Sequence, residues 1–155
     1  MESDSWILLL DSLDPHCQVF DALRLRTADA YITAHLDYDE TDALGQKENR
    51  EHSRPALASH VDNLDDYDRI FLGFPNWYYD MPMAVYAFLE KYDLSGKTII
   101  PFVTSGGSGF SNAVSVIQSI QPDAEVLTDG YQVTHSKVDG VTLADIQEWI
   151  DGLDR

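Results

Sequence analysis

A run of aromatic residues after one apolar segment is the first feature of the sequence that suggests chemistry. Residues 73–82, Gly-Phe-Pro-Asn-Trp-Tyr-Tyr-Asp-Met-Pro, leave a predicted buried strand and enter a predicted helix, with Pro82 near the first helical turn. Trp77, Tyr78 and Tyr79 lie at the tip, where three consecutive rings cannot all face one core. Planar rings in such a loop suit stacking on a planar ligand; the alternative is that they cap the domain's own core.

A second segment combines glycines with hydroxyl groups. Residues 104–111, Thr-Ser-Gly-Gly-Ser-Gly-Phe-Ser, connect another apolar strand to another helical pattern. Glycine permits close approach of the backbone, and hydroxyl and amide groups offer hydrogen bonds to the edge of a ligand. An ordinary turn with a helix-capping serine is the alternative, although such turns often need only ~2–6 residues. The length of the loop therefore favours ligand binding.

The remaining reactive residues form no recognisable catalytic or metal-binding set. Ser105 and Ser108 raise a hydrolase as a further alternative, but the sequence contains neither a GxSxG elbow nor an evident histidine partner. The 5 histidines show no HExxH or His-x-His spacing. Cys17 is the single cysteine, which excludes an internal disulfide and a CxxC redox motif. We expect no catalytic side chain and no metal site.

The hydrophobic pattern predicts a framework that places both segments at one edge of a sheet. Five stretches have the pattern of strands: Trp6–Leu10, Ala30–Leu36, Arg69–Gly73, Thr98–Val103 and Glu125–Val133, the last bent or split at Asp129-Gly130. Helical spacing of apolar residues lies between them, at residues 19–23, 85–92, 114–120 and 146–153. This alternation predicts an α/β fold with a parallel sheet and helices on both faces. The polar stretch 37–60 is expected to hold one short helix between longer loops.

Composition narrows the class of protein. The 155 residues fit a single domain over positions 1–155. With 27 acidic and 10 basic residues the net charge is −17, which disfavours nucleic acid and anionic membranes and would favour a basic partner protein. An acidic start, the lone cysteine and the lack of an apolar run near ~20 residues predict a cytoplasmic protein.

Two longer stretches resemble a known family. Residues 67–77, Tyr-Asp-Arg-Ile-Phe-Leu-Gly-Phe-Pro-Asn-Trp, and residues 95–109, Ser-Gly-Lys-Thr-Ile-Ile-Pro-Phe-Val-Thr-Ser-Gly-Gly-Ser-Gly, are similar to the small flavodoxin-like proteins of bacteria, as is Arg54-Pro55. The resemblance implies a flavodoxin-like three-layer sandwich whose five-stranded parallel sheet has the order 2-1-3-4-5. It also implies noncovalent FMN, used for electron transfer or oxidoreduction.

The same resemblance implies which residues bind the cofactor. Pro75, Asn76, Trp77 and Tyr78 would cover one side of the isoalloxazine ring. Its other edge would lie along Thr104, Ser105, Gly106, Gly107, Ser108 and Gly109. The redox chemistry would then belong to the flavin, and the protein would tune the flavin's potential through stacking and hydrogen bonds, with a basic protein as redox partner.

The segment after the first strand departs from the family pattern. Flavodoxin-like proteins hold the FMN phosphate there with Ser, Thr, Gly and Asn residues at a helix N-terminus, whereas this chain has Asp11-Ser-Leu-Asp-Pro-His16. Asp14 before Pro15 predicts an N-cap whose carboxylate takes the amides that a phosphate needs. A carboxylate about 4 Å from a phosphate costs on the order of 4 kcal/mol, roughly a thousandfold in affinity, which a protonated His16 could partly offset.

Three outcomes follow for the ligand. They are weak FMN binding, binding of a flavin without the phosphate such as riboflavin, and no flavin at all. In the last case the protein would be a cofactor-free, flavodoxin-like binding or regulatory module.

Overall fold

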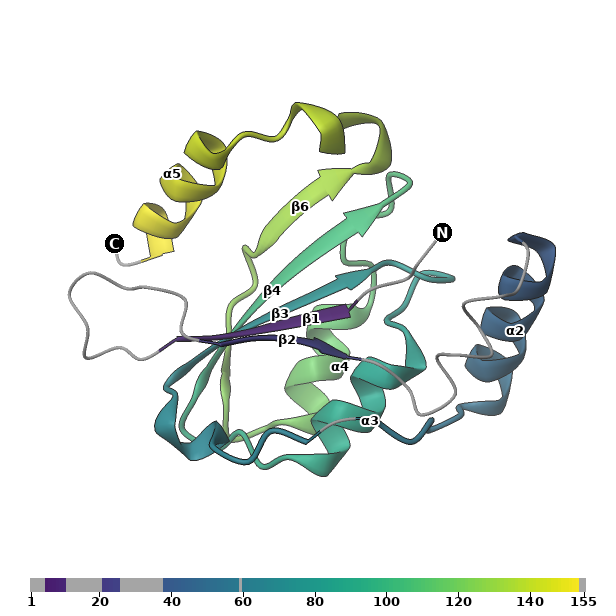
Figure 1. The fold of residues 1–155 in the computed structure, drawn as a ribbon, viewed down its shortest axis with the longest axis horizontal. Helices are drawn as coiled ribbons and strands as arrows, with labels where there is room; N and C mark the ends of the chain where they lie inside the picture. Colours follow the sequence, from purple (N-terminus) through teal and green to yellow (C-terminus); the bar gives the residue numbers. More distant parts are fainter. Residues whose placement is uncertain (1–4, 11–20, 26–37, 59, 154–155) are drawn as a thin grey trace.

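One sheet with helices on both faces forms the part of the chain described by the computed structural model, residues 5–10, 21–25, 38–58 and 60–153 (Figure 1). The elements are, in order, β1 (Ser5–Leu10), β2 (Asp21–Leu25), α2 (Tyr38–Glu51), η1 (Leu64–Asp66), β3 (Arg69–Pro75), α3 (Met83–Lys91), β4 (Thr98–Ser105), α4 (Ala113–Ile120), β5 (Glu125–Val126), β6 (Tyr131–Thr134), η2 (His135–Gly140) and α5 (Leu143–Leu153).

The strand order is the one predicted from the sequence. It runs β2-β1-β3-β4-β5, with β6 also paired to β4. Strands β3, β4, β5 and β6 are parallel, as helical crossovers require. The α/β class and the order 2-1-3-4-5 are therefore confirmed. The strand in second place is Asp21–Leu25, whereas the predicted second strand, Ala30–Leu36, lies outside the described residues.

The direction of β1 differs from the prediction of a fully parallel sheet. β1 is antiparallel to both β2 and β3, with Trp6 opposite Gly73 and Leu10 opposite Arg69. A continuous apolar run indicates burial on both faces, but a buried strand can satisfy its backbone groups in either direction. The apolar pattern of Trp6–Leu10 therefore predicts a central strand without fixing its direction.

Two further predictions in the N-terminal third are wrong, and two others lie outside the described residues. Asp21–Leu25 is a strand rather than the predicted helix, because a short apolar stretch is compatible with either period. The helix α2 has 14 residues where a short one was expected; Asp39 and Glu40 in its first turn and Arg50 in its last complement the helix dipole. The predicted strand Ala30–Leu36 and the segment Asp11–His16 lie outside the described residues.

The fifth strand is split, as predicted at Asp129-Gly130. Ile99 pairs with Val126 in β5, and Phe102 pairs with Tyr131 in β6. The break faces Pro101, which has no amide hydrogen to donate to a ladder. A Cβ at Gly130 would collide with the Pro101 carbonyl oxygen, so glycine allows the chain to pass close to the neighbouring strand there.

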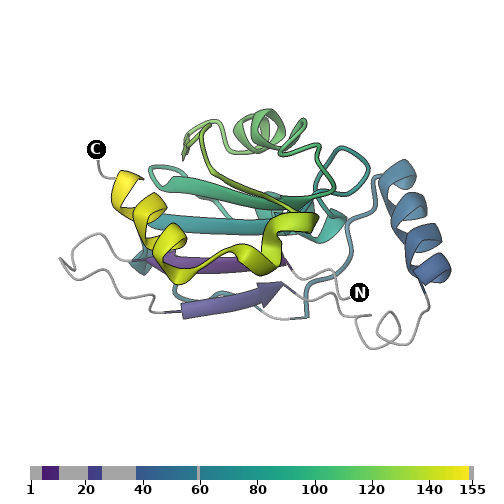
Figure 2. The same cartoon turned by 90° about the horizontal axis from the view of Figure 1, so that it is seen from above.

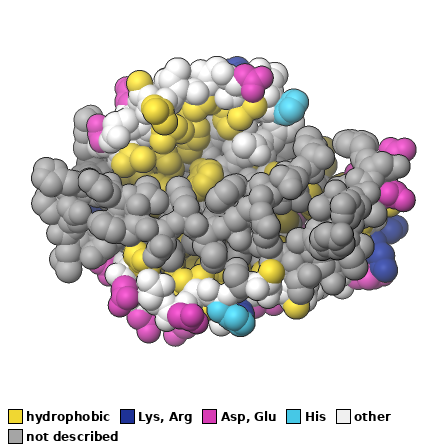
Figure 3. Space-filling view, in the orientation of Figure 1, with side chains coloured by type: hydrophobic (Ala, Val, Ile, Leu, Met, Phe, Trp, Pro, Cys, Tyr) yellow, Lys and Arg dark blue, Asp and Glu magenta, His cyan; other side chains and the backbone are white. Residues whose placement is uncertain are grey.

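The two sheet faces bury different clusters. Ile70, Leu72 and Phe74 of β3 point to the main core, which α3 and α4 cover, while Phe71 points to the opposite face with Ile100, beneath Trp149 of α5. This alternation along β3 is the two-residue period of a strand. Helix α5 therefore lies across the sheet from α3 and α4, and α2 stands at one end of the molecule (Figures 1 and 2). Apolar side chains remain visible beside α5 in Figure 3.

Candidate functional site

The two segments singled out in the sequence meet at the carboxyl ends of β3 and β4. Pro75 and Thr104 are in register at the end of the ladder. The Asn76 backbone amide donates to the Thr104 carbonyl at 2.8 Å. Its side-chain amide donates to the Gly109 carbonyl at 2.9 Å and to the Ser111 Oγ at 3.1 Å. Asn76 thus fastens one segment to the other.

Residues Trp77–Asp80, the aromatic turn, form a tight two-residue reversal. The Trp77 amide donates to the Asp80 carbonyl at 2.8 Å and the Asp80 amide to the Trp77 carbonyl at 2.9 Å. Tyr78 and Tyr79 have φ values of 53° and 65°, the left-handed region that such a turn requires at both central positions. Left-handed backbone costs about 1–2 kcal/mol for each non-glycine residue. The aromatic turn therefore stores strain, which proteins retain at sites where the conformation has a use.

Helix α2 holds the aromatic turn from one side. The Tyr78 hydroxyl donates to the Asp42 carboxylate at 2.6 Å, and it also lies 2.9 Å from the Asp42 carbonyl. A Cβ at Gly45 would lie 3.3 Å from the Tyr78 ring and 3.4 Å from Trp77, so the missing side chain at Gly45 lets the turn rest against α2. Tyr79 points elsewhere and is 72% exposed.

A network on α3 holds the turn from the other side. The Tyr86 hydroxyl lies 2.9 Å from each carboxylate oxygen of Asp80, and the Met81 amide also donates to Asp80 at 2.8 Å. Burial, followed by the hydrogen bond to Asp80, raises the pKa of Tyr86 far above its usual value. The Arg54 guanidinium lies 4.6 Å from the Tyr86 ring centre and binds Glu90 through two hydrogen bonds of 2.7 Å.

Residues Ser105–Ser111, the glycine loop, use one serine internally and leave backbone groups open. Ser105 is buried, and its hydroxyl accepts from the amides of Gly107 and Gly109 at 3.2 and 3.0 Å. Gly106, Gly107 and Ser108 are exposed. The backbone amides of Gly106 and Ser108 have no hydrogen-bond partner among the described residues. The glycine loop thus offers two free donors beside the aromatic turn.

The end of β6 adjoins this edge, and no motif of the sequence pointed to it. Thr134 is in register with Ser105, and η2 follows directly with His135 and Lys137. One signal could have found it. The predicted strands Glu125–Val133 and Thr98–Val103 follow each other in the expected strand order, so their ends should lie side by side. This segment places two basic residue types next to the glycine loop.

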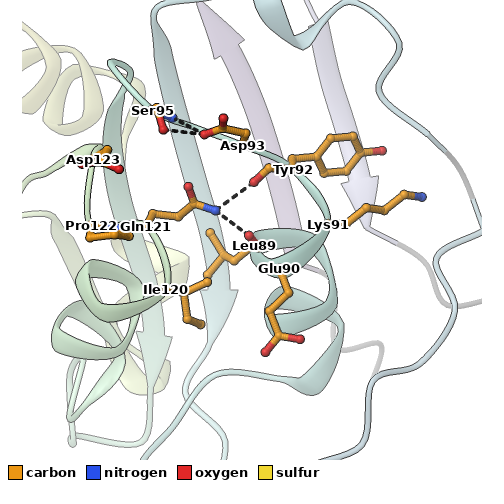
Figure 4. A pocket seen from close by; sticks show the side chains of 10 residues that line it. All are labelled: Leu89, Glu90, Lys91, Tyr92, Asp93, Ser95, Ile120, Gln121, Pro122 and Asp123. Atoms are coloured by element: carbon orange, nitrogen blue, oxygen red, sulfur yellow. Dashed lines mark hydrogen bonds between the residues drawn. The ribbon is translucent and has the colours of Figure 1, made fainter.

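A hollow of about 580 Å³ lies at the other edge of the sheet (Figure 4). Residues 89–93, 95 and 120–123 line it, before the amino ends of β4 and β5. The buried Gln121 side chain accepts from the Leu94 amide at 3.0 Å and donates to the Tyr92 carbonyl at 2.8 Å and to the Leu89 carbonyl. These partners satisfy all three of those backbone groups. The hollow is thus the outer side of a closed structural junction, whereas ligands of open α/β sheets bind at the carboxyl edge.

Comparison with known proteins decides the family. The family profile described as Flavodoxin matches residues 16–153. The chain belongs to the flavodoxin family.

Two solved structures from Bacteroides species agree with this membership of the flavodoxin family. A candidate flavoprotein from Bacteroides uniformis is 34% identical, with a TM-score of 0.68 over 82% of this chain and 78% of its own. A second, from Bacteroides eggerthii, is 29% identical, with a TM-score of 0.66 over 83% and 78%. A flavoprotein from Lactobacillus acidophilus, solved in complex with FMN, is 21% identical, with a TM-score of 0.48 over 67% and 69%. No curated protein matches the chain.

The structure brings together the residues that flavodoxin resemblance assigned to the flavin ring, in two roles. Pro75, Asn76, Thr104, Ser105 and Gly109 build the junction between the two segments. Trp77, Tyr78, Gly106, Gly107 and Ser108 form the rim. Binding of a flavin by these residues remains a prediction.

The predicted phosphate segment Asp11–His16 cannot be placed from the described residues. The strand before it ends at Leu10, beside Arg69 at the amino end of β3. The described residues therefore contain the two segments predicted beside the flavin ring, and the segment predicted beside the phosphate is not among them.

The described residues contain neither a metal-ligating cluster nor a membrane-spanning helix. No group of three or more His, Cys, Asp or Glu side chains in that part of the chain could hold a metal ion. None of its helices combines the length and the apolar character needed to span a bilayer.

Proposed function

We propose that the chain binds the ring of a flavin at the carboxyl edge of β3 and β4, as an electron-transfer protein or oxidoreductase. The observation that carries this proposal is the pair of backbone amides at Gly106 and Ser108, which have no hydrogen-bond partner in the described part of the chain, beside the strained aromatic turn. Strain concentrates at functional sites, and open backbone donors at a strand end suit the polar edge of a ring. Membership of the flavodoxin family and two relatives described as candidate flavoproteins support it.

The residues present fit a flavin ring. The isoalloxazine system has a planar face and a polar edge of carbonyl and ring-nitrogen acceptors. Trp77 supplies an aromatic face, and the amides of Gly106 and Ser108 supply donors for the edge. The Asp80 carboxylate accepts hydrogen bonds from the Tyr86 hydroxyl and the Met81 amide, and these bonds hold its negative charge within the aromatic turn.

When bound, a flavin supplies the electron-accepting and electron-donating chemistry, because none of these side chains is redox-active at ordinary potentials. The residues of this chain bind and orient it. Stacking on Trp77 and hydrogen bonds from the glycine loop would act on the oxidised and reduced ring to different degrees, and that difference sets the potential.

The ring rather than the phosphate is the part recognised in this proposal. Asp11–His16 carries two carboxylates where the family has phosphate donors. FMN and riboflavin share the ring and differ in the phosphate, so we expect the two to bind with affinities within about tenfold of each other, a difference of about 1.4 kcal/mol.

Flavin fluorescence provides the test. Titrating the full chain into FMN and into riboflavin should quench both. Quenching of neither at high protein concentration would contradict flavin binding and favour the cofactor-free module. Quenching of FMN alone would contradict ring recognition and show that a phosphate site exists.

A further inference from the structure

Two tyrosine–aspartate pairs, each joined by a hydrogen bond, hold the aromatic turn in place. The Tyr78 hydroxyl reaches Asp42 of α2, and the Tyr86 hydroxyl of α3 reaches Asp80, the last residue of the turn. Both pairs join the turn to a helix. The second pair is the more constrained, because the Asp80 carboxylate also accepts from the Met81 amide.

The position of Tyr86 is itself fixed by its neighbours. Arg54 lies over its ring at 4.6 Å, and Arg54 is held by Glu90 and by the carbonyls of His52 and Ser53. Tyr86 and Glu90 are one helical turn apart on α3. Arg54 therefore bridges them, and the Tyr86 hydroxyl has little freedom to leave Asp80.

The left-handed turn needs such a restraint. Tyr78 and Tyr79 both have positive φ, where residues other than glycine rarely lie. Without a hold on Asp80, the two hydrogen bonds between Trp77 and Asp80 would have to maintain the turn against this strain. Because Trp77 begins the turn, relaxation of the backbone would move its ring relative to the glycine loop.

We propose that Tyr86 is a positioning residue, whose hydroxyl on Asp80 holds the aromatic turn in its left-handed form and so sets its fit to a flavin ring. The part of this inference that concerns the flavin rests on the proposed function. The part that concerns the turn does not.

Hydrogen exchange in the flavin-free protein tests the hold on the turn. Replacing Tyr86 by Phe removes the hydroxyl alone, and the amides of Trp77 and Asp80 should then exchange about tenfold faster, as expected for loss of one charge-assisted hydrogen bond. Tyr92→Phe is the matched control, because the Tyr92 hydroxyl instead accepts from the Val61 amide at 2.9 Å. Unchanged exchange at the turn in Tyr86→Phe would overturn the proposal.

A double-mutant cycle tests the link to the flavin. Tyr86→Phe should weaken flavin binding about tenfold. Tyr79→Gly removes part of the strain, so in that background Tyr86→Phe should weaken binding less than threefold. An equal loss in both backgrounds would show that Tyr86 acts only through general stability and would contradict positioning.

The outcomes separate the two proposals. If the parent chain binds no flavin, the proposed function fails, and hydrogen exchange still decides the role of Tyr86. If the parent binds flavin and Tyr86→Phe binds equally well, the proposed role of Tyr86 fails alone. Should Tyr86→Phe not fold, Asp80→Ala removes the same hydrogen bond at its acceptor, together with the one from the Met81 amide, and its Trp77 amide should exchange at least about tenfold faster; an unchanged rate would reject the proposal.

Discussion

The polar groups at the two ends of the strands, the amino edge and the carboxyl edge of the sheet, differ in whether they have hydrogen-bond partners. At the amino edge, one buried side chain, Gln121, satisfies the Leu94 amide and the carbonyls that end α3. At the carboxyl edge, the amides of Gly106 and Ser108 find no partner among the described residues, and Tyr78 and Tyr79 lie in strained backbone. The hollow of this molecule therefore does not coincide with the groups that can bind a ligand. The hollow lies at the closed edge, and the groups available to a ligand lie at the other.

The largest expected effect is a loss of stability when the hydrogen bonds of Gln121 at the amino edge are removed. Gln121→Leu leaves the buried Leu94 amide and two carbonyls without partners, and each buried unsatisfied group costs about 1–3 kcal/mol. Urea unfolding should show a loss of about 3 kcal/mol or more. Gln118, an exposed residue of α4, the helix that Gln121 follows, is the control; Gln118→Leu should change stability by less than about 0.5 kcal/mol.

The flavin affinity of the folded Gln121→Leu protein should stay the same within error. A large loss of flavin affinity in the folded Gln121→Leu protein would mean that the amino edge takes part in binding, and the two edges would then not differ in this respect.

The next effect concerns the ring face of the carboxyl edge. Trp77→Ala should weaken flavin binding by about 2 kcal/mol, roughly thirtyfold, because an aromatic stacking surface is lost. Trp77→Phe keeps a ring and should recover most of that loss. If the alanine variant binds as tightly as the parent, Trp77 does not stack on the ligand.

A smaller effect has the opposite sign. Tyr79→Gly relieves left-handed strain of about 1–2 kcal/mol, against about 0.5–1 kcal/mol of added backbone entropy in the unfolded chain. The variant should therefore be more stable by about 0.5–1 kcal/mol in urea unfolding. Tyr79→Ala removes the same exposed ring but keeps the strain, so its stability should not rise. Equal behaviour of the two variants would show that the turn is not strained.

The smallest effect is the pH dependence of the Arg54–Glu90 pair. Hydrogen bonds from Arg54 lower the pKa of Glu90 in the folded protein. The stabilisation is present above the unfolded pKa of about 4.3 and is lost as the pH falls through the folded value. Because the Glu90 side chain is 42% exposed, Glu90→Gln should cost less than about 1 kcal/mol at pH 7.

The cost of Glu90→Gln should shrink as the pH is lowered, since the parent loses the same interaction on protonation. The control Glu148→Gln, on the exposed side of α5, should show no such convergence. A difference that grows toward acid pH would contradict the ion-pair account.

The sequence predicted the parts of the fold that hydrophobic periodicity controls. Strands β3 and β4, helices α3 and α4, and the break before β6 all follow from apolar spacing and from Asp129-Gly130. The direction of β1 did not follow, because burial is the same either way. Helix α2 was underestimated because its stability comes from charge placement and from Gly45 resting on the aromatic turn rather than from an apolar face.

The sequence predicted the two segments that meet at the carboxyl edge, but not how they are joined and held. Aromatic and glycine-rich segments after neighbouring strands identify the edge. The reversal at Tyr78 and Tyr79 lacks the Asn-Gly pair typical of this turn, so no local signal announces it. The hold of Tyr86 on Asp80 joins an α3 side chain to a loop residue six positions earlier, and Ser105 acts inside its own loop. Such roles depend on packing that appears only in three dimensions.

Backbone NMR shift mapping with riboflavin and FMN tests the contrast between the edges most directly. Either flavin should perturb the amides of residues 76–80 and 105–111 and leave those of residues 89–95 and 120–123 unchanged. Perturbation centred on residues 89–95 and 120–123, with a silent carboxyl edge, would contradict it.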